Sequence, residues 1–180
     1  MVTNYKHYIE GERIYLREVR IEDVNEDYYR WMNDPEVNRY LETRYIPQSI
    51  ENIKRYVQRM DAKQDEIFLA ICLKGNKKHI GNIKLGPVNW IHKFGDISLV
   101  IGDKDCWGKG YASEAISLIS KFAFSTLNMH KLVAGIYEQN IGSAKAFEKA
   151  GYHKESTFKK HWYVDGKFYD EYVYLSLIHI

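Results

Sequence analysis

The chain contains little cysteine, little proline and almost no excess of either charge. Its 180 residues include two cysteines and three prolines, and 26 lysines and arginines nearly balance 24 aspartates and glutamates. Cys72 and Cys106 are far apart in the sequence and match no zinc-ligand spacing, so we expect no metal site and a reduced, cytoplasmic setting. The net charge of +2 gives no basic surface of the kind that nucleic acids require, so we expect no nucleic-acid partner.

Long apolar runs are also absent from the sequence. No stretch approaches the length of a membrane span, and the N-terminal residues lack the apolar segment of a signal peptide, so we expect no contact with a membrane. The chain is 45% hydrophobic and 28% charged, which is typical of a globular protein. It shows no linker and no repeat, and its 180 residues can bury a core of their own, so we expect a single domain over residues 1–180.

Two glycines separate a predicted strand from a predicted helix near the middle of the chain. The apolar residues 95–101 predict a buried strand, and apolar residues at three- and four-residue spacing predict a helix over residues 112–123. Gly108 and Gly110 lie between them, where a helix N-terminus offers unpaired N–H groups to an anion such as a pyrophosphate. A lone Gly-x-Gly more often makes only a tight turn, and this one matches neither the Walker lysine loop nor the dinucleotide fingerprint.

The rest of the chain shows an ordered series of predicted strands and helices. Strands are predicted over residues 13–19, 67–73, 79–85, 131–137, 152–164 and 168–178, and helices over residues 23–32, 50–60 and 143–150. Residues 1–11 are expected to form a lead-in, Asp23 and Ser49 to be helix N-caps, and Gly151 to be a helix C-cap. Asp165-Gly166 is a strong hairpin signal. Together these predictions give a mixed α/β sheet with the glycine elbow at its middle.

Four motifs, in this order, resemble those of the GNAT acetyltransferases and, among these, of the RimJ/RimL-like branch. They are Trp31-Met32-Asn33-Asp34-Pro35-Glu36-Val37, Ile80-Gly81-Asn82-Ile83, the elbow Trp107-Gly108-Lys109-Gly110-Tyr111-Ala112-Ser113-Glu114-Ala115, and Asn140-Ile141-Gly142-Ser143 with Phe147-Glu148-Lys149-Ala150-Gly151-Tyr152. The resemblance covers residues 10–177. It implies an α/β (α+β) fold, with a mixed, mostly antiparallel central sheet flanked by helices and a splayed strand pair that holds acetyl-CoA. It also implies an N-acetyltransferase that uses acetyl-CoA as co-substrate and needs no metal.

The same resemblance implies which residues bind acetyl-CoA. The pantetheine arm is expected to add to the backbone of Leu99, Val100 and Ile101, with a β-bulge that splays this strand from the next one. Asn140, which ends the next strand, is expected to hold the pantetheine. The pyrophosphate is expected on the backbone of Trp107, Gly108, Lys109, Gly110, Tyr111 and Ala112. Candidates for contacts to the CoA phosphates, or else for a solvated helix surface, are Lys109, Lys145 and Lys149.

The implied chemistry needs few residues. An alkylammonium, with a pKa of about 10.4, must lose its proton before it attacks a thioester. Asp96 is the candidate base, or else a structural hydrogen-bonding residue or an outward-facing strand residue. The backbone N–H of Val100 is expected to stabilise the oxyanion. Ser143 is a candidate proton donor to the leaving thiolate, or else a residue that caps the helix or packs against it. A covalent route through Cys106 is disfavoured, because nothing in the sequence pairs this cysteine with a histidine.

The sequence departs from the family pattern at two positions. Asp105 stands three residues before the first elbow glycine, where the family usually has Gln or Arg, and an acid is unfavourable near a pyrophosphate. Phe147 stands where many members have the tyrosine that protonates the thiolate, and a phenyl ring cannot donate a proton. These departures leave open a non-catalytic module that only binds acyl-CoA.

The acceptor is expected to contact the segment from residue 31 to residue 44 and the final hairpin. Core packing is an equal alternative for one candidate, Trp31. The pattern of motifs is most similar to relatives found with sugar-modification enzymes, so we expect a small-molecule primary amine such as an amino sugar. A protein N-terminal (ribosomal-protein-like) amine is the alternative, and a homodimer is left open. The candidate substrate-binding residues are Trp31, Asp34, Glu42 and Arg44, with His161 and Tyr163 on the hairpin.

Overall fold

The computed structural model describes residues 7–177 of the chain. The strands are β1 (Ile9–Glu10), β2 (Ile14–Glu18), β3 (Ile67–Leu73), β4 (His79–Asn89), β5 (Phe94–Ile101), β6 (Lys131–Tyr137), β7 (His153–Val164) and β8 (Lys167–Leu177). The α-helices are α1 (Glu26–Asn33), α2 (Pro35–Asn38), α3 (Ile50–Asp61), α4 (Tyr111–Ser125) and α5 (Ile141–Lys149). Short 3-10 helices are η1 (Ile21–Asp23), η2 (Glu42–Tyr45) and η3 (Lys104–Cys106). Residues 1–6 of the predicted lead-in and the predicted strand end at Ile178 lie outside the described residues.

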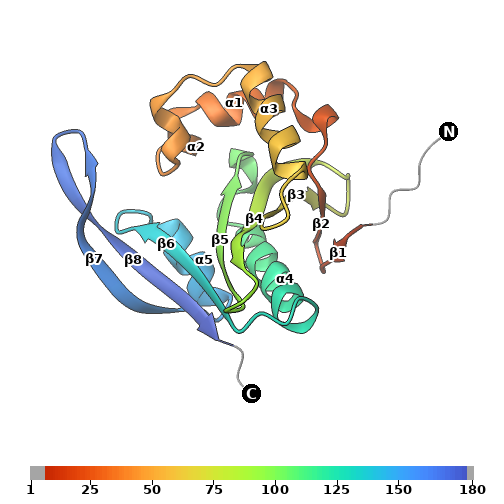
Figure 1. Cartoon of the computed structure of the whole chain (residues 1–180). Coiled ribbons are helices and arrows are strands. Elements are labelled where there is room, and N and C mark those ends of the chain that lie inside the picture. Colours follow the sequence, from red (N-terminus) through yellow and green to blue (C-terminus); the bar gives the residue numbers. More distant parts are fainter. Residues whose placement is uncertain (1–6, 178–180) are drawn as a thin grey trace.

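The strands of this part of the chain form one sheet in the order β1-β2-β3-β4-β5-β6-β8-β7 (Figure 1). Neighbouring strands are antiparallel except β5 and β6, which are parallel. The parallel ladder joins residues 94–96 to residues 131–133 and ends at Asp96 and Val133, although both strands continue. Beyond this point the two strands diverge (Figure 1). The predicted mixed, mostly antiparallel sheet with a splayed strand pair is therefore confirmed.

The bulge that we expected in β5 is found in β4. Between Leu85 and Val88, β4 has one residue more than the β5 segment from Ile97 to Gly95 that lies opposite. Pro87 lies in this interval and has no N–H to give to a sheet ladder, so a bulge is where a strand accommodates it. The strand predicted over residues 79–85 therefore continues past the bulge to the end of β4.

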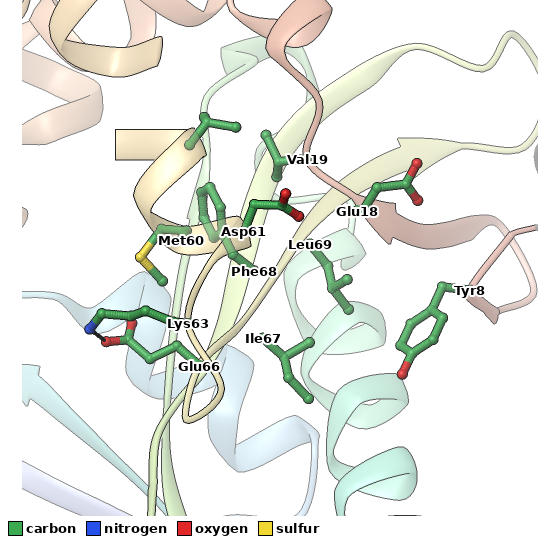
Figure 2. A pocket seen from close by; sticks show the side chains of 11 residues that line it. Tyr8, Glu18, Val19, Met60, Asp61, Lys63, Glu66, Ile67, Phe68 and Leu69 are labelled. Carbon is green, nitrogen blue, oxygen red and sulfur yellow. Dashed lines mark hydrogen bonds and ion pairs between the residues drawn. The ribbon is translucent and has the colours of Figure 1, made fainter. Parts of the chain in front are cut away.

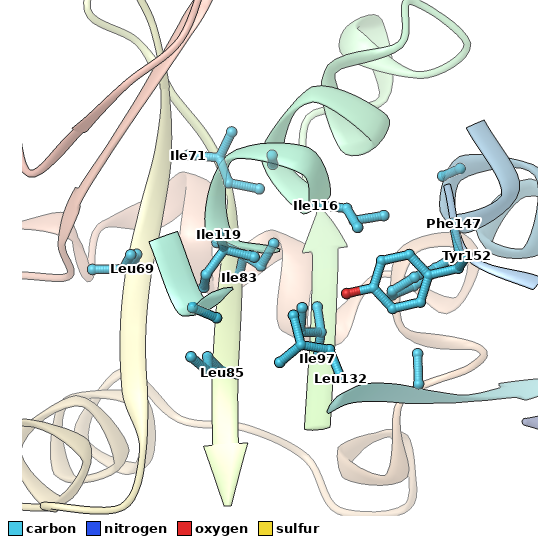
Figure 3. Close-up of a cluster of buried hydrophobic side chains, with 14 of the residues drawn as sticks. Leu69, Ile71, Ile83, Leu85, Ile97, Ile116, Ile119, Leu132, Phe147 and Tyr152 are labelled. Carbon is cyan, nitrogen blue, oxygen red and sulfur yellow. The ribbon is translucent and has the colours of Figure 1, made fainter. Parts of the chain in front are cut away.

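Apolar side chains on the two faces of the sheet form two separate cores. One face of the central strands packs against α4 and α5 around Ile83, Ile116 and Phe147 (Figure 3). The other face packs against α1 and α3 around Trp31 and Val57. The first core thus supports the strands on both sides of the opening between β5 and β6. Within the described range, no helix is long and apolar enough to cross a membrane.

A hydrogen bond and the backbone φ angles confirm three predicted boundaries. The Ser49 hydroxyl accepts from the backbone N–H of Asn52 at 3.1 Å and caps α3. Gly151 follows α5 with a φ of 91°, the left-handed conformation of a helix C-cap. Asp165 and Gly166 form the hairpin between β7 and β8 with φ values of 49° and 77°, as a type I′ turn requires.

Two predicted boundaries near the N-terminus are wrong. Helix α1 is capped by Asn25, whose side chain accepts from the amides of the first turn, and not by Asp23. Asp23 instead holds the Arg17 guanidinium through two hydrogen bonds of 2.7 Å. The expected lead-in contains β1, which pairs with β2. A two-residue strand is too short to show a periodic pattern in the sequence.

Candidate active site

The elbow between β5 and α4 presents free backbone amides. Helix α4 starts after Gly110, which has a φ of 82° and provides no side-chain cap. Among the described residues, no amide from Gly108 to Ser113 donates a hydrogen bond, and the first helical bond runs from Glu114 to Gly110. Free amides at a helix N-terminus bind anions. The amide of Trp107 is an exception to our expectation, because it donates to the carbonyl of Lys104 at 3.1 Å.

Two residues that the sequence did not assign hold the elbow in this shape. The Arg13 guanidinium donates to the carbonyl of Lys109 at 2.8 Å and to the carboxylate of Glu114 at 2.9 Å. Glu114 also accepts from the backbone N–H groups of Arg13, at 2.8 Å, and Ile14, at 3.2 Å. Burial opposes the ionisation of Glu114, but these hydrogen bonds outweigh it and lower the pKa of the carboxyl. A contact across about a hundred residues leaves no local pattern in the sequence.

The backbone groups of β5 that face the opening belong to Leu99 and Ile101. The amide of Gly102 donates to the carbonyl of Ile80 in β4 at 2.9 Å. Hydrogen-bonding direction alternates along an antiparallel ladder, so Val100 also faces β4, opposite Asn82. The expectation that the amide of Val100 stabilises an oxyanion is therefore wrong, because the ladder uses this amide. The indole of Trp107, which donates to the Ile101 carbonyl at 2.7 Å, confirms that this carbonyl is turned away from the ladder.

Asn140 and Ser143 lie at the end of β6, on the other side of the opening. Asn140 is the N-cap of α5, and its side-chain oxygen accepts from the amide of Ser143 at 3.2 Å. The capping alternative for Ser143 is therefore wrong, and its hydroxyl is free for another role among the described residues. Lys145 and Lys149 follow on the same helix, and both are exposed.

Three carboxylates gather on the face of the opening opposite α4 and α5. Asp96 lies where the β5–β6 ladder ends, and its side chain is exposed. The atoms around it still remove enough water to raise its pKa, an effect that Lys84 partly opposes. Glu171 on β8 and Glu42 on η2 are close enough for their charges to interact, and Asp96 and Glu42 both raise the pKa of Glu171. Glu171 also pairs with the ring of His161 at 3.2 Å.

Tyr137 links these acids to the predicted acceptor segment. Its hydroxyl donates to Glu42 and accepts from the Arg44 guanidinium at 3.2 Å, which places two predicted residues at the end of β6. Burial and the neighbouring Glu42 raise the pKa of Tyr137 to about 12. The ring of Trp162 stacks on Tyr137 at 4.8 Å. Beside this group lies a hollow of about 860 Å³ lined by residues from α1, α2, η2 and the β7–β8 turn, including Asn38, Arg39, Tyr40, Arg44, Gln139 and Asp165.

Three predicted acceptor residues lie elsewhere. Trp31 is 7% exposed and belongs to the second core. Its ring lies against Gly102, and a Cβ atom on Gly102 would be only 2.0 Å from the nearest ring atom. Its placement favours core packing over contact with an acceptor. Asp34 caps α2 and pairs with Lys104 of η3 at 2.7 Å. Tyr163, on the tip of the hairpin, is exposed and packs on Phe168.

The unusual positions of the sequence have structural explanations. Phe147 is 1% exposed and packs edge-on against Tyr152 at 5.1 Å, so its ring serves the first core. Asp105 is exposed, and its amide donates to the Asp103 side chain at 3.0 Å within η3. Cys106 is buried, and burial together with Asp103 raises the pKa of its thiol, which disfavours a thiolate.

A second hollow lies on another part of the sheet. It has a volume of about 210 Å³ and lies between α3, β2 and β3, lined by Glu18, Met60, Asp61 and Phe68 among others (Figure 2). Lys63 and Glu66 form an ion pair at its side (Figure 2). None of the site residues predicted from the sequence lines it.

The opening and the elbow define a class of protein. The backbone of β5 at Leu99 and Ile101 faces no neighbouring strand, and apart from the Ile101 carbonyl, which Trp107 occupies, it suits an extended arm that carries amides. The adjacent free amides of the elbow suit a pyrophosphate. Such a site fits a nucleotide-linked acyl carrier. The sequence profile of the acetyltransferase (GNAT) domain matches residues 13–153. The chain belongs to the GNAT acetyltransferase family and is an acetyl-CoA-dependent N-acetyltransferase.

Individual relatives agree with this assignment. The probable N-acetyltransferase YjcK of Bacillus subtilis is 27% identical over 177 residues, which cover 92% of this chain and 94% of that protein. The crystal structure of an acetyltransferase (GNAT family) from Bacillus anthracis has a TM-score of 0.82 at 27% identity and covers 94% of this chain and 97% of that chain. Spermidine N-acetyltransferase from Vibrio cholerae, in complex with CoA and spermine, has a TM-score of 0.82 at 20% identity, with coverages of 93% and 96%, and shares the fold. The RimJ/RimL-like branch stays a prediction.

No local pattern in the sequence identified Glu171, Tyr137, Arg13 or the role of Glu114. One signal for Glu171 was present, since Asp170 and Glu171 interrupt an otherwise aromatic strand. Acidic residues in the middle of a strand are unusual, because strands favour β-branched and aromatic residues.

Proposed function

We propose that the acceptor is a small primary amine that binds as a cation, and that a molecule with more than one ammonium group, such as a polyamine, fits the site best. The observation that carries this proposal is the gathering of Asp96, Glu42 and Glu171 at the opening. Carboxylates attract ammonium groups and repel phosphates. The stacked rings of Tyr137 and Trp162 offer an aromatic surface to the cation and to its methylene groups.

The amino sugar expected from the sequence meets this description only in its free form. A nucleotide-linked amino sugar carries a negatively charged diphosphate, and the three carboxylates oppose its approach. Two of the nearby cations are already engaged, because Lys84 pairs with Glu66 at 2.8 Å and Arg44 bonds to Tyr137. The name of the matched spermidine N(1)-acetyltransferase of Vibrio cholerae, which is 26% identical over 94 residues, supports a polyamine.

The reaction is proposed to proceed by direct attack of the amine. Acetyl-CoA supplies the thioester at the opening, and its pyrophosphate is held by the elbow amides. A carboxylate of the site takes the proton of the ammonium so that the nitrogen lone pair can attack. Asp96 is the candidate predicted from the sequence for this role, and Glu171 is a second candidate at the opening. The backbone amides that face the opening, at Leu99 and Ile101, are placed to stabilise the oxyanion. Ser143, at the start of α5, is the proposed proton donor to the leaving thiolate.

Thiol release from acetyl-CoA with a panel of acceptors tests the proposal. Spermidine, free glucosamine, a nucleotide-linked amino sugar and a short peptide with a free N-terminus are compared at equal concentration. We expect the highest kcat/KM with spermidine and a decrease as salt is added, because salt screens exposed charges. Asp96→Asn is expected to raise the KM for spermidine by about tenfold. Asp61→Asn, at the hollow of Figure 2, is the matched control and should leave the KM and kcat for spermidine unchanged.

The other acceptors give the outcomes that overturn the proposal. Faster transfer to the peptide than to every small amine would favour the protein N-terminal alternative. Faster transfer to the nucleotide-linked sugar would show that the carboxylates do not select the acceptor by charge.

A further inference from the structure

Glu171 reaches the opening from a strand that does not border it. It lies on β8, and β6 separates β8 from β5. Its carboxylate lies over Gly135 of β6, where a Cβ atom would be 2.1 Å from Oε1 of Glu171. Any side chain at residue 135 would therefore occupy the position of the carboxylate. The glycine in the middle of β6 is what allows Glu171 to extend across this strand toward Asp96.

The surroundings of Glu171 suit a group that exchanges protons. Only 13% of its side chain is exposed, and its carboxylate is 3.2 Å from the ring of His161, which is 43% exposed. Burial raises the pKa of Glu171, His161 opposes this shift, and the charges of Asp96 and Glu42 add to it. Tyr137, which pairs with Glu171 across the ladder, donates its hydroxyl proton to Glu42 instead. Glu171 is therefore a stronger base than an ordinary carboxylate and has a neighbour in contact with water.

We propose that Glu171 is the general base of acetyl transfer, that His161 carries the proton on to solvent, and that Asp96 and Glu42 hold the acceptor. The Glu171 carboxylate takes one proton from the ammonium nitrogen of the acceptor. The freed lone pair forms the C–N bond to the thioester carbonyl carbon. As the C–S bond breaks, the nitrogen loses its second proton to give the neutral amide, and this proton goes to the leaving thiolate. This inference rests on acetyl transfer to an amine and does not require that the amine is a polyamine.

Kinetics of Glu171→Gln and Gly135→Ala test the assignment, with spermidine as the acceptor. Glu171→Gln should lower kcat by at least about a hundredfold, with an unchanged affinity for acetyl-CoA in calorimetry. In the wild type, kcat/KM should rise with pH as the base loses its proton, and Glu171→Gln should remove this rise. Asp96→Asn should act mainly on KM. Glu155→Gln, which removes a glutamate beside a histidine elsewhere on the hairpin, should leave both constants unchanged.

Gly135→Ala separates the position of the carboxylate from its chemistry. The methyl group should displace Glu171 and lower kcat as Glu171→Gln does. The variant that carries both Gly135→Ala and Glu171→Gln should have the same kcat as Glu171→Gln alone, because glutamine at residue 171 has already lost the basic carboxylate. Gly75→Ala is the control, since a Cβ atom on Gly75 meets nothing within 4 Å.

Three outcomes would overturn the inference. The first is a Glu171→Gln enzyme with the kcat and pH profile of the wild type. The second is a double variant whose kcat falls by the product of the two single-variant decreases. If the wild type acetylates no amine of the panel, the proposed function fails, and the slow hydrolysis of acetyl-CoA becomes the readout for Glu171. The Glu171 carboxylate should then activate water for this hydrolysis. Equal rates of acetyl-CoA hydrolysis by the wild type and by Glu171→Gln are therefore the third outcome that would overturn the inference.

Discussion

Replacing Glu114 with alanine is expected to destabilise the fold and weaken the binding of acetyl-CoA at the same time. The Glu114 carboxylate is 14% exposed and accepts from the amides of Arg13 and Ile14 and from the Arg13 guanidinium. The ion pair contributes little, roughly 0.5 kcal/mol, because Arg13 is 46% exposed. The larger cost, about 1–3 kcal/mol, comes from leaving the part-buried amides without an acceptor. A loss of about 2 kcal/mol corresponds to a decrease in Tm of about 4–8 °C for a chain of this size.

Urea unfolding and calorimetry with acetyl-CoA measure the two effects. The Arg13 guanidinium also holds the carbonyl of Lys109, so its release should loosen the elbow and raise the Kd for acetyl-CoA. The hydrogen bonds lower the pKa of Glu114 below its ordinary value of 4.5. The stabilisation is therefore complete above that value and disappears as the pH falls through the lower folded-state pKa. Lys121→Ala, on the exposed side of the same helix, is the control. Equal stabilities of wild type and Glu114→Ala at pH 7 would refute the reasoning.

Three further predictions concern the first core, the elbow and the proton donor. Phe147→Ala should reduce the free energy of unfolding by about 3–5 kcal/mol in urea titrations, because it leaves a cavity at a residue that is 1% exposed. Gly110→Val should raise the Kd for acetyl-CoA by at least about tenfold, because a β-branched residue is strained at a φ of 82°; a Kd unchanged in calorimetry would contradict the cradle. Ser143→Ala should lower kcat about tenfold while the α5 cap by Asn140 persists, and Ser143→Thr should restore activity.

The sequence was sufficient for the features that depend on local patterns. Neighbouring residues determine the periodic patterns of the strands and helices, the Ser49 cap and the Asp165-Gly166 turn. The structure contains each of these features. The glycine elbow was found for the same reason, because Gly108 and Gly110 lie next to a periodic helix. The family resemblance added the splayed strands, which no local pattern encodes.

The features that the sequence did not predict depend on contacts between distant residues. Glu171 becomes part of the site only because β8 pairs with β6 and because Gly135 leaves space above that strand. Trp31 belongs to a family motif, but burial of its large apolar ring in the core stabilises the fold more than an exposed position would. The direction of the Val100 amide depends on which neighbours form the ladder, and single-residue properties do not specify it.

The short ladder between β5 and β6 has a consequence for the mechanics of the whole domain. Three residue pairs are the only rungs that join the β1–β5 half of the described sheet to the β6–β8–β7 half. We expect an acyl carrier bound along the open edge to take the place of the missing rungs and to connect the two halves of the sheet. Catalysis and rigidity would then be coupled in this protein, because each turnover would add and remove the element that connects the two halves.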